Sequence, residues 1–170
     1  AEFLQPDLIR ELAEEVVART AFLFGAMQPQ GGEIPVVMSS GSSGIFLHEA
    51  IGHAFEADFI RKNTSIFSDK MGKRICRTGI TIVDDGTIPG NRGALNVDDE
   101  GVPGQKTYMV TDGILTSFLH DRISASYFNV SPTGNGRRES FRYMPQPRMR
   151  ATYMENGTDS AESLIASVKK

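Results

Sequence analysis

The segment from Gly41 to Asp58 constrains this chain more than any other, because it puts two imidazoles and a carboxylate into one short helix. It reads GSSGIFLHEAIGHAFEAD and holds two of the three histidines, His48 and His53, with Glu49 directly after the first. A flexible Gly/Ser loop leads in, and the apolar residues 45–47 predict that the helix is largely buried. Polar groups removed from water without partners cost several kcal/mol. Such a helix therefore needs compensation, and a bound cation is the simplest form of it.

The spacing of the two histidines predicts an unusual helical turn. Many zinc proteases carry His-Glu-x-x-His, in which the histidines share one helical face and the glutamate is the general base. Here one more residue separates them, and positions i and i+5 of a regular α-helix lie about 140° apart. A π-type turn has i→i+5 hydrogen bonds, concentrates at functional sites and returns the two positions to one face. Gly52 would relieve crowding in such a turn.

We therefore hypothesise that His48 and His53 bind Zn²⁺ through imidazole nitrogens, at the roughly 2.0–2.1 Å usual for zinc. The alternative is two core histidines that bond to backbone carbonyls. Glu56 and Asp58 follow on the same predicted helix. They are candidates to accept the second ring N–H, because ligating histidines usually donate it to a carboxylate or carbonyl. A solvated helix end is the alternative for these two acids.

The same segment resembles the metal motif of the TldD-like metallopeptidases, in the TldD/PmbA family once called modulators of DNA gyrase. The resemblance covers nearly everything from Ile34 to Lys170, as several ungapped blocks in the same order. These blocks are Val83–Thr87, Asp98–Gln105, Asp112–Leu115, Pro132–Ser140 and Pro145–Met149.

The resemblance implies a zinc-dependent peptidase that hydrolyses peptides or partly unfolded proteins. In it, His48 and His53 would be the metal ligands and Glu49 the catalytic general base. It also implies a homo- or heterodimer with a TldD- or TldE-like subunit, of which only the TldD-like one carries the metal motif. The alternative is a non-catalytic peptide-binding or scaffold module of a two-subunit protease.

Members of the family are far longer than this chain, and their third zinc ligand is a cysteine in a Cys-Gly-Lys segment of a C-terminal region. No such segment occurs before Lys170. We therefore expect an internal fragment of a larger TldD-like protein, which by itself binds zinc weakly and is inactive. We expect one domain over residues 1–170, with an amphipathic helix in residues 1–27 and the metal-motif region in residues 34–170.

Composition narrows the range of partners. The chain has 170 residues and a net charge of −3, which provides no basic surface for nucleic acid. Its single cysteine excludes an internal disulfide and fits a reducing compartment. No apolar run approaches the roughly 20 residues that span a membrane, and no signal-peptide pattern is present. We therefore expect a cytoplasmic protein that binds neither nucleic acid nor a membrane.

The remaining pattern predicts an α+β fold, a mostly antiparallel sheet with packed helices. Asp112-Gly113 joins two apolar runs, Lys106–Thr111 and Ile114–Leu119, and is a strong signal for a hairpin with a type I′ turn. An amphipathic helix is expected over Pro6–Phe24. Further strands are expected at Pro35–Ser39, Ile75–Val83 and Arg150–Met154, and further helices at His120–Phe128 and, capped by Asp159, up to Val168.

The loop Ser131–Ser140 is a second candidate site. Two glycines flank Asn135, and Arg137 and Arg138 follow. Glycine lets backbone amides approach a ligand closely, and arginine can clamp a carboxylate through paired hydrogen bonds. We hypothesise that Asn135, Arg137 and Arg138 border a peptide-binding cleft. A purely structural loop is the alternative.

Three other features have weaker functional interpretations. Cys76 could offer a thiolate to the metal, but the family's ligand cysteine does not align there. His120 is the only histidine outside the motif and could assist an oxyanion, although a lone histidine is more often structural. The acids at residues 98–100 could bind a cation, but they lack the regular ligand alternation of a calcium loop, so a turn is expected.

Overall fold

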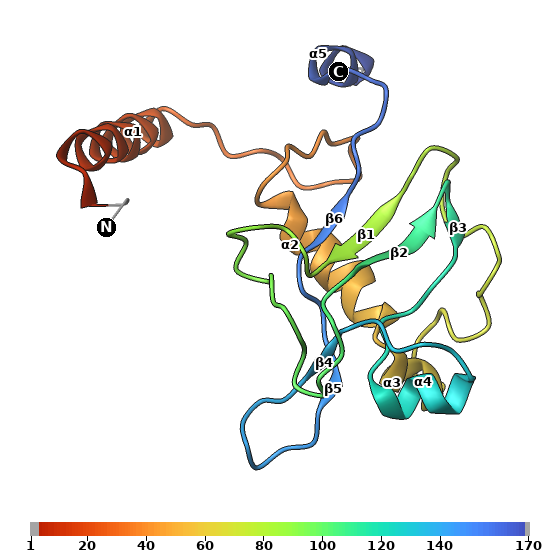
Figure 1. Ribbon diagram of the computed structural model, residues 1–170. Coiled ribbons are helices and arrows are strands. Elements are labelled where there is room, and N and C mark those ends of the chain that lie inside the picture. Colours follow the sequence, from red (N-terminus) through yellow and green to blue (C-terminus); the bar gives the residue numbers. More distant parts are fainter. Residues whose placement is uncertain (1–3, 169–170) are drawn as a thin grey trace. The chain divides into compact units, whose positions relative to one another are not determined.

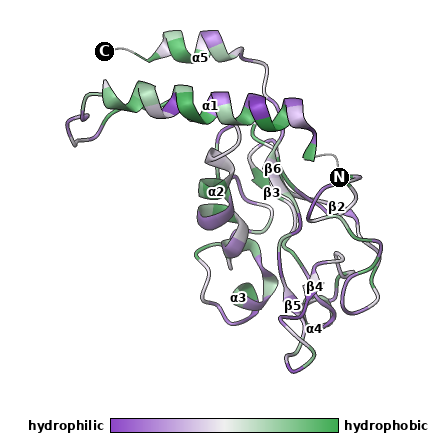
Figure 2. Ribbon diagram, turned by 90° about the vertical axis from the view of Figure 1, so that its left-hand side faces the viewer, coloured by the Kyte–Doolittle hydropathy of each residue, from purple (hydrophilic) through white to green (hydrophobic). Residues whose placement is uncertain are grey.

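The computed structural model describes residues 4–168 of the chain, which divides into two compact units, Ala1–Val36 and Val37–Lys170. The first unit holds helix α1, Pro6–Phe24, with a proline in its first turn. The predicted helix is therefore confirmed. None of its residues is buried, and apolar side chains such as Val16 and Phe22 are 63% and 77% exposed. Figure 2 shows apolar and polar residues interspersed along it.

The second unit is built on an antiparallel sheet with the strand order β3-β2-β1-β6 (Figure 1). Its strands are β1 Ile82–Asp85, β2 Lys106–Thr111, β3 Ile114–Leu115 and β6 Thr152–Met154. The β1 strand lies in the middle and pairs with both β2 and β6. With the helices described below, this arrangement confirms the predicted α+β fold.

Strands β2 and β3 form the predicted hairpin. Asp112 and Gly113 both have positive φ, 50° and 79°, as a type I′ turn requires. A Cβ on residue 113 would also lie 2.6 Å from the carbonyl oxygens of Cys76 and Arg77, so a close backbone approach demands glycine there as well. The second strand is shorter than expected, because pairing ends at Leu115.

The metal-motif segment changes its helical form along its length. Its parts are α2 Ser43–Leu47, a π-helical turn His48–Gly52, a 3₁₀ turn His53–Phe55 and α3 Ala57–Arg61. The expected continuous helix through Asp58 is wrong at Glu56, whose backbone is extended (φ −69°, ψ 121°). The cause is pairing with a neighbour: Glu56 makes a parallel bridge with Leu119.

The other elements are short: α4 Arg122–Phe128, β4 Gly136–Arg137, β5 Gln146–Pro147 and α5 Ala161–Ser167. The carboxylate of Asp121 caps α4 by accepting the N–H of Ser124. Ser160 caps α5 by accepting the N–H of Ser163, so the cap predicted at Asp159 is wrong by one residue. Within residues 4–168, no helix combines the length and apolarity needed to cross a membrane.

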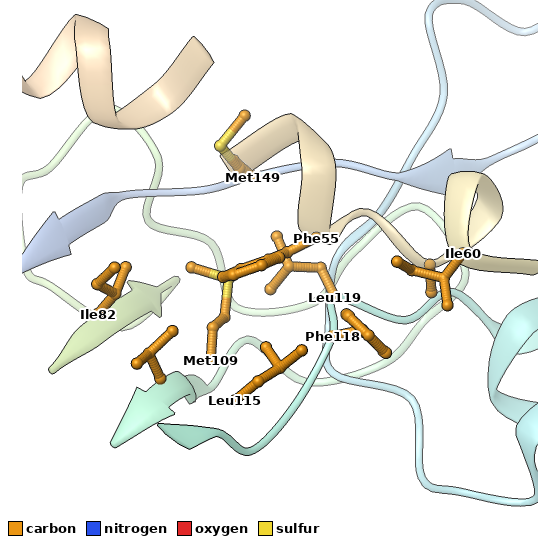
Figure 3. Packing of buried hydrophobic residues seen from close by; sticks show 10 residues of the cluster. Phe55, Ile60, Ile82, Met109, Leu115, Phe118, Leu119 and Met149 are labelled. Atoms are coloured by element: carbon orange, nitrogen blue, oxygen red, sulfur yellow. The ribbon is translucent and has the colours of Figure 1, made fainter. Parts of the chain in front are cut away.

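The core lies where the motif segment meets the sheet. Phe55 is fully buried and meets Phe67 and Phe118 edge to face, with centroids 4.9 and 6.2 Å away. Figure 3 shows its ring beside Met109 of β2. Burial of apolar surface contributes roughly 25 cal/mol per Å², so this cluster holds the motif segment on the sheet. Its buried members are Phe55, Ala57, Ile60, Ile82, Met109, Val110, Leu115, Phe118, Leu119 and Met149.

Two of the predicted strands need correction. Pro35–Ser39 forms no strand, because a strand needs a neighbour to satisfy its backbone groups and Val36 and Val37 are 68% and 44% exposed. The strand expected at Ile75–Val83 begins only at Ile82. At its start, the N–H of Ile75 donates to Gly113 at the hairpin turn.

The start of the motif helix is also more exposed than predicted. Ile45 and Phe46 are 67% and 65% exposed. One face of the helix does reach the core, through the partly buried Leu47 and Ile51. The helix therefore covers the sheet with one side only, which leaves its other side open.

Candidate metal centre

The π-helical turn brings His48 and His53 together. The N–H of His53 donates to the carbonyl of His48, which is the i→i+5 bond of a π turn. The two ring centroids lie 4.7 Å apart, with the ring planes at 89° to one another. The helical form predicted from the spacing is therefore confirmed.

Glu49 completes a compact group of potential ligands. One ligand atom from each of His48, Glu49 and His53 lies within 4.8 Å of the other two. Among residues 4–168, these three side chains form the cluster of histidine and acidic residues that could hold a metal ion. Glu49 is exposed, and the side chain of His53 is 42% exposed, so solvent reaches the group. Two imidazole nitrogens suit Zn²⁺, and the carboxylate beside them can act on a water molecule at the site. The residues present therefore fit the metal that the motif indicates.

Gly52 lies at the end of the π turn and is buried. A Cβ at this position would fall 2.0 Å from the sulfur of Met149, a core residue that is 6% exposed. A Cβ here would force the flexible end of Met149 to move, so glycine allows the packing of Met149 beside the motif helix that Figure 3 shows. The glycine that the sequence indicated as relief for a crowded turn makes room for a side chain from a distant segment.

His53 is held by a buried carboxylate. Its Nδ1 lies 3.2 Å from Oε1 of Glu56, and Glu56 is fully buried. The other oxygen, Oε2, accepts a hydrogen bond from Nη1 of Arg148 at 2.9 Å. Burial raises the pKa of the Glu56 carboxyl, and the contacts with Arg148 and His53 oppose that rise. Glu56 thus stands where the sequence predicted a partner for a ring N–H.

Asp58, the other predicted partner, lies in a different contact. Its Oδ2 accepts a hydrogen bond from Nζ of Lys62 at 3.2 Å, and its Oδ1 lies 3.8 Å from Nη1 of Arg148. Within the described chain, Oδ1 is buried without a hydrogen-bond partner. Of the two acids, therefore, Glu56 contacts a histidine and Asp58 faces Arg148 and Lys62.

Asn135 is buried inside the loop that the sequence marked as a second site, with 1% of its surface exposed. Its Nδ2 donates to Oδ2 of Asp84 at 2.7 Å and to the carbonyl of Arg148 at 2.9 Å. Its Oδ1 accepts from the hydroxyl of Thr133 at 2.7 Å. These contacts favour the structural alternative for Asn135 over direct contact with a substrate.

Arg137 and Arg138 follow Asn135 and are exposed. The N–H of Arg138 donates to Oδ2 of Asp99 at 2.7 Å, which fixes the backbone of the loop there. Both residues are exposed, and a role in binding a peptide carboxylate stays a prediction for this pair.

Sequence reasoning assigned no role to Arg148 or Asp84, which connect the loop Ser131–Ser140 to the metal group. Arg148 belongs to the block Pro145–Met149 of the family resemblance, and Asp84 follows the strand expected at Ile75–Val83 but lies within β1. The one sequence signal that pointed toward Arg148 was an acid, Glu56, on a helix expected to be buried. A buried carboxylate needs a cation or several hydrogen bonds. Glu56 lies 92 residues from Arg148 in sequence, and no local pattern links such positions.

Two of the weaker candidates, His120 and Asp98, are buried, and the third, Cys76, is partly buried. Cys76 is partly buried, and burial raises the pKa of its thiol. His120 is 4% exposed, its Nδ1 lies 3.2 Å from the hydroxyl of Ser124, and burial lowers its pKa to about 4. Asp98 accepts the N–H groups of Glu100 and Val102 on one oxygen, which is the expected turn.

Several known proteins similar to this chain are named metalloproteases. The family model described as the PmbA/TldA metallopeptidase C-terminal domain matches residues 31–170. The metalloprotease TldD homolog of Haemophilus influenzae is 46% identical over 158 residues, which cover 93% of this chain and 33% of that protein. The zinc metalloprotease TldD homolog of Saccharolobus solfataricus is 38% identical over 143 residues, which cover 84% of this chain and 32% of that protein. The chain thus spans about a third of the length of these curated relatives.

Two crystal structures share the fold. TldE from Thermococcus kodakarensis has a TM-score of 0.61 and 29% identity, and the match covers 69% of this chain and 27% of that one. A Thermotoga maritima protein, named for a proposed role as modulator of a DNA gyrase, has a TM-score of 0.71 and 27% identity, with 82% of this chain and 31% of that one covered. Since the family model covers most of the chain and the relatives agree with it, the chain belongs to the PmbA/TldD metallopeptidase family.

Proposed function

We propose that this chain carries the zinc-binding and catalytic residues of a peptidase that hydrolyses peptides or partly unfolded proteins. The observation that carries the proposal is the π turn, with ligand atoms of His48, Glu49 and His53 all within 4.8 Å of one another. Zinc is supported by the imidazole donors and by the name of the Saccharolobus solfataricus relative.

His48 and His53 would hold the ion. A proton on Nδ1 of His53, shared with Glu56 at 3.2 Å, leaves Nε2 with the lone pair that a metal requires. When bound, Zn²⁺ supplies a Lewis acid that polarises a peptide carbonyl and makes water more acidic.

Glu49 would act as the general base. It directly follows His48 and is exposed, and one of its carboxylate oxygens belongs to the compact group. It can therefore accept a proton from a water molecule at the site and pass it to the leaving amine of the cleaved peptide. This role requires its carboxylate to stay free of the metal.

The proposed substrate class and the proposed partner subunit are supported by two further observations. The exposed Arg137 and Arg138 provide guanidinium groups that can bind the carboxylate of a peptide. The similarity to TldE supports a homo- or heterodimer with a TldD- or TldE-like subunit. Both statements concern the complete protein.

The test compares Glu49→Gln with His48→Gln in the complete protein. Glu49→Gln is expected to keep its zinc, measured by elemental analysis, and to lose peptide hydrolysis by about 10²–10⁴-fold, the usual effect of a general base. His48→Gln is expected to lose both. Glu14→Gln, on the exposed face of α1, is the matched control and should keep both. Hydrolysis at the wild-type rate by Glu49→Gln would overturn the assignment.

The second candidate function is a non-catalytic peptide-binding or scaffold subunit. One observation favours it: with Glu49 kept as a base, the group found among residues 4–168 leaves only two imidazoles as ligands, whereas catalytic zinc sites usually have three protein ligands. A complete protein that binds an unfolded peptide, holds no zinc and cleaves nothing would support this second function.

A further inference from the structure

A continuous path of contacts leads from the ring of His53 into the sheet. Its first member is Glu56, where one carboxylate oxygen contacts Nδ1 of His53 at 3.2 Å and the other accepts from Arg148 at 2.9 Å. Each oxygen therefore contacts one nitrogen, and the ring nitrogen can donate when it carries the proton. Glu56 is itself fixed at the extended break after the 3₁₀ turn, where the next amide, that of Ala57, donates to Leu119 at 2.9 Å.

The second member, Arg148, is fixed along its backbone. Its N–H donates to the carbonyl of Asn135 at 2.9 Å, and its carbonyl accepts from Nδ2 of the same asparagine at 2.9 Å. Its guanidinium also donates to the carbonyl of Pro147 at 2.6 Å. Arg148 is thus held through both peptide groups that flank its Cα, and its guanidinium is held by the carbonyl of Pro147.

The third member ties this loop to the sheet. Asp84 lies in the middle of β1, is 1% exposed, and accepts from Nδ2 of Asn135 at 2.7 Å. Its other oxygen accepts from the N–H of Arg150 at 2.9 Å and the hydroxyl of Thr152 at 2.7 Å. The carboxylate of Asp84 therefore connects β1 with the loop of Asn135 and with the segment that runs from Arg148 to Thr152.

We propose that Arg148 is a positioning residue of the metal centre, which acts through Glu56 to fix the ring orientation and the protonated nitrogen of His53. Asn135 and Asp84 complete the device by fixing Arg148. The proposal rests on the proposed function, because it gives His53 the role of a ligand. It gives Asn135, from the second candidate loop, a role in supporting the metal centre.

A competing explanation is that Arg148 only balances buried acids. Arg148 faces two of them, since Asp58 lies 3.8 Å from the same Nη1. Asp58 has no contact with a histidine among the hydrogen bonds of residues 4–168. If Arg148 only balanced charge, substitutions of Asp58 and of Glu56 would change zinc affinity to a similar extent. If Arg148 positions His53, zinc affinity depends on Glu56 and not on Asp58.

The experiment measures zinc affinity in the complete protein by competition with a chelator. Arg148→Gln and Glu56→Ala are each expected to weaken zinc binding by about 10–100-fold, the usual effect of removing a partner of a ligating histidine. Arg148→Lys should recover part of the loss, because it keeps a cationic donor for Glu56. Asp58→Asn and Arg142→Gln, an exposed arginine, are the matched controls and should stay within about twofold of wild type.

A second measurement needs no variant and no metal. Nitrogen NMR of the metal-free wild-type protein, labelled at histidine, should find the proton of neutral His53 on Nδ1. A proton on Nε2 would overturn the proposal, even if Arg148→Gln does not fold. Zinc affinity of a folded Arg148→Gln equal to wild type would also overturn it. Wild-type protein that binds no zinc would instead refute the proposed function, which the NMR result does not address.

Discussion

Met149 and Gly52 are in such close contact that a Cβ on residue 52 would lie 2.0 Å from the methionine sulfur. This contact places a core side chain directly against the π turn that carries His48 and His53. A regular helix does not need glycine, and a glycine in its interior is unfavourable. Its presence here follows from packing, and the packing in turn supports the turn that pairs the two imidazoles.

Gly52→Ala is therefore expected to lower the free energy of unfolding by about 1–3 kcal/mol, as overpacking usually does, and to weaken zinc binding. Denaturant unfolding and chelator competition measure the two effects. Gly44→Ala is the matched control, because nothing lies within 4 Å of a Cβ at this position of α2, and it should be neutral or stabilising. Equal behaviour of the two variants would contradict the role of the Met149 contact.

Zinc should stabilise the folded protein through the two histidines. A ligand that binds only the folded state at a hundred times its Kd adds about 2.7 kcal/mol. Zinc added at that excess should therefore raise the unfolding midpoint of the wild type, and a chelator should reverse the shift. In His48→Gln and His53→Gln the increment should disappear. An undiminished increment in both variants would show that zinc binds elsewhere.

The local elements of the fold were readable from the sequence, because their signals are local. Pro6–Phe24 follows a helical repeat, and Asp112-Gly113 supplies the two positive φ angles of the hairpin. The π turn was readable because the distance between His48 and His53 allows few other ways to share a face. In each case a few consecutive residues determine the structure.

The rest depends on partners far away in sequence. The valines of Pro35–Ser39 look like a strand, yet a strand exists only where a neighbour pairs with it. Asn135 and Asp84 are 51 residues apart in sequence, so the burial of Asn135 could not be read from its glycine-flanked loop. Arg148 was missed for the same reason, since its partner Glu56 is specified only by the folded chain.

His120 should make stability depend on pH. It is buried, with the rings of Phe118 and Phe128 beside it and Nδ1 at 3.2 Å from Ser124. Burial lowers its pKa from 6.5 to about 4, and the nearby Asp121 opposes the shift. Between about pH 4 and pH 6.5, His120 is therefore protonated in the unfolded chain and neutral in the folded chain. The stability from this group is thus complete above about pH 6.5 and is lost as the pH falls toward 4, by about 3 kcal/mol at most.

His120→Gln tests this dependence, because it cannot titrate. The difference in free energy of unfolding between wild type and variant, measured from pH 7.5 to 4, should shrink as the pH falls. Taking the difference removes the contribution of other groups, among them Asp84 and Glu100, whose pKa values burial raises. A difference that stays constant over this range would contradict a neutral buried His120.

In the loop Ser131–Ser140, we expect Asn135 to contribute to stability and Arg137 and Arg138 to contribute to substrate binding. Asn135→Ala leaves Asp84 and the backbone of Arg148 without donors they use, and a buried group left unpaired costs about 1–3 kcal/mol. We expect that loss in denaturant unfolding, together with weaker zinc binding. Arg137→Ala and Arg138→Ala, at exposed positions, should leave the unfolding midpoint within about 0.5 kcal/mol of wild type.

The same arginine variants should raise the KM for a peptide substrate of the complete protein and leave its zinc content unchanged, because a guanidinium that binds a carboxylate contributes about 1.5–3 kcal/mol. A carboxyl-amidated peptide is the control substrate, since it lacks the group that the arginines would bind and should respond less to the substitutions. Unchanged KM for both peptides in both variants would exclude these arginines from the peptide-binding cleft. The loop would then serve only to hold Arg148, through the buried contacts of Asn135.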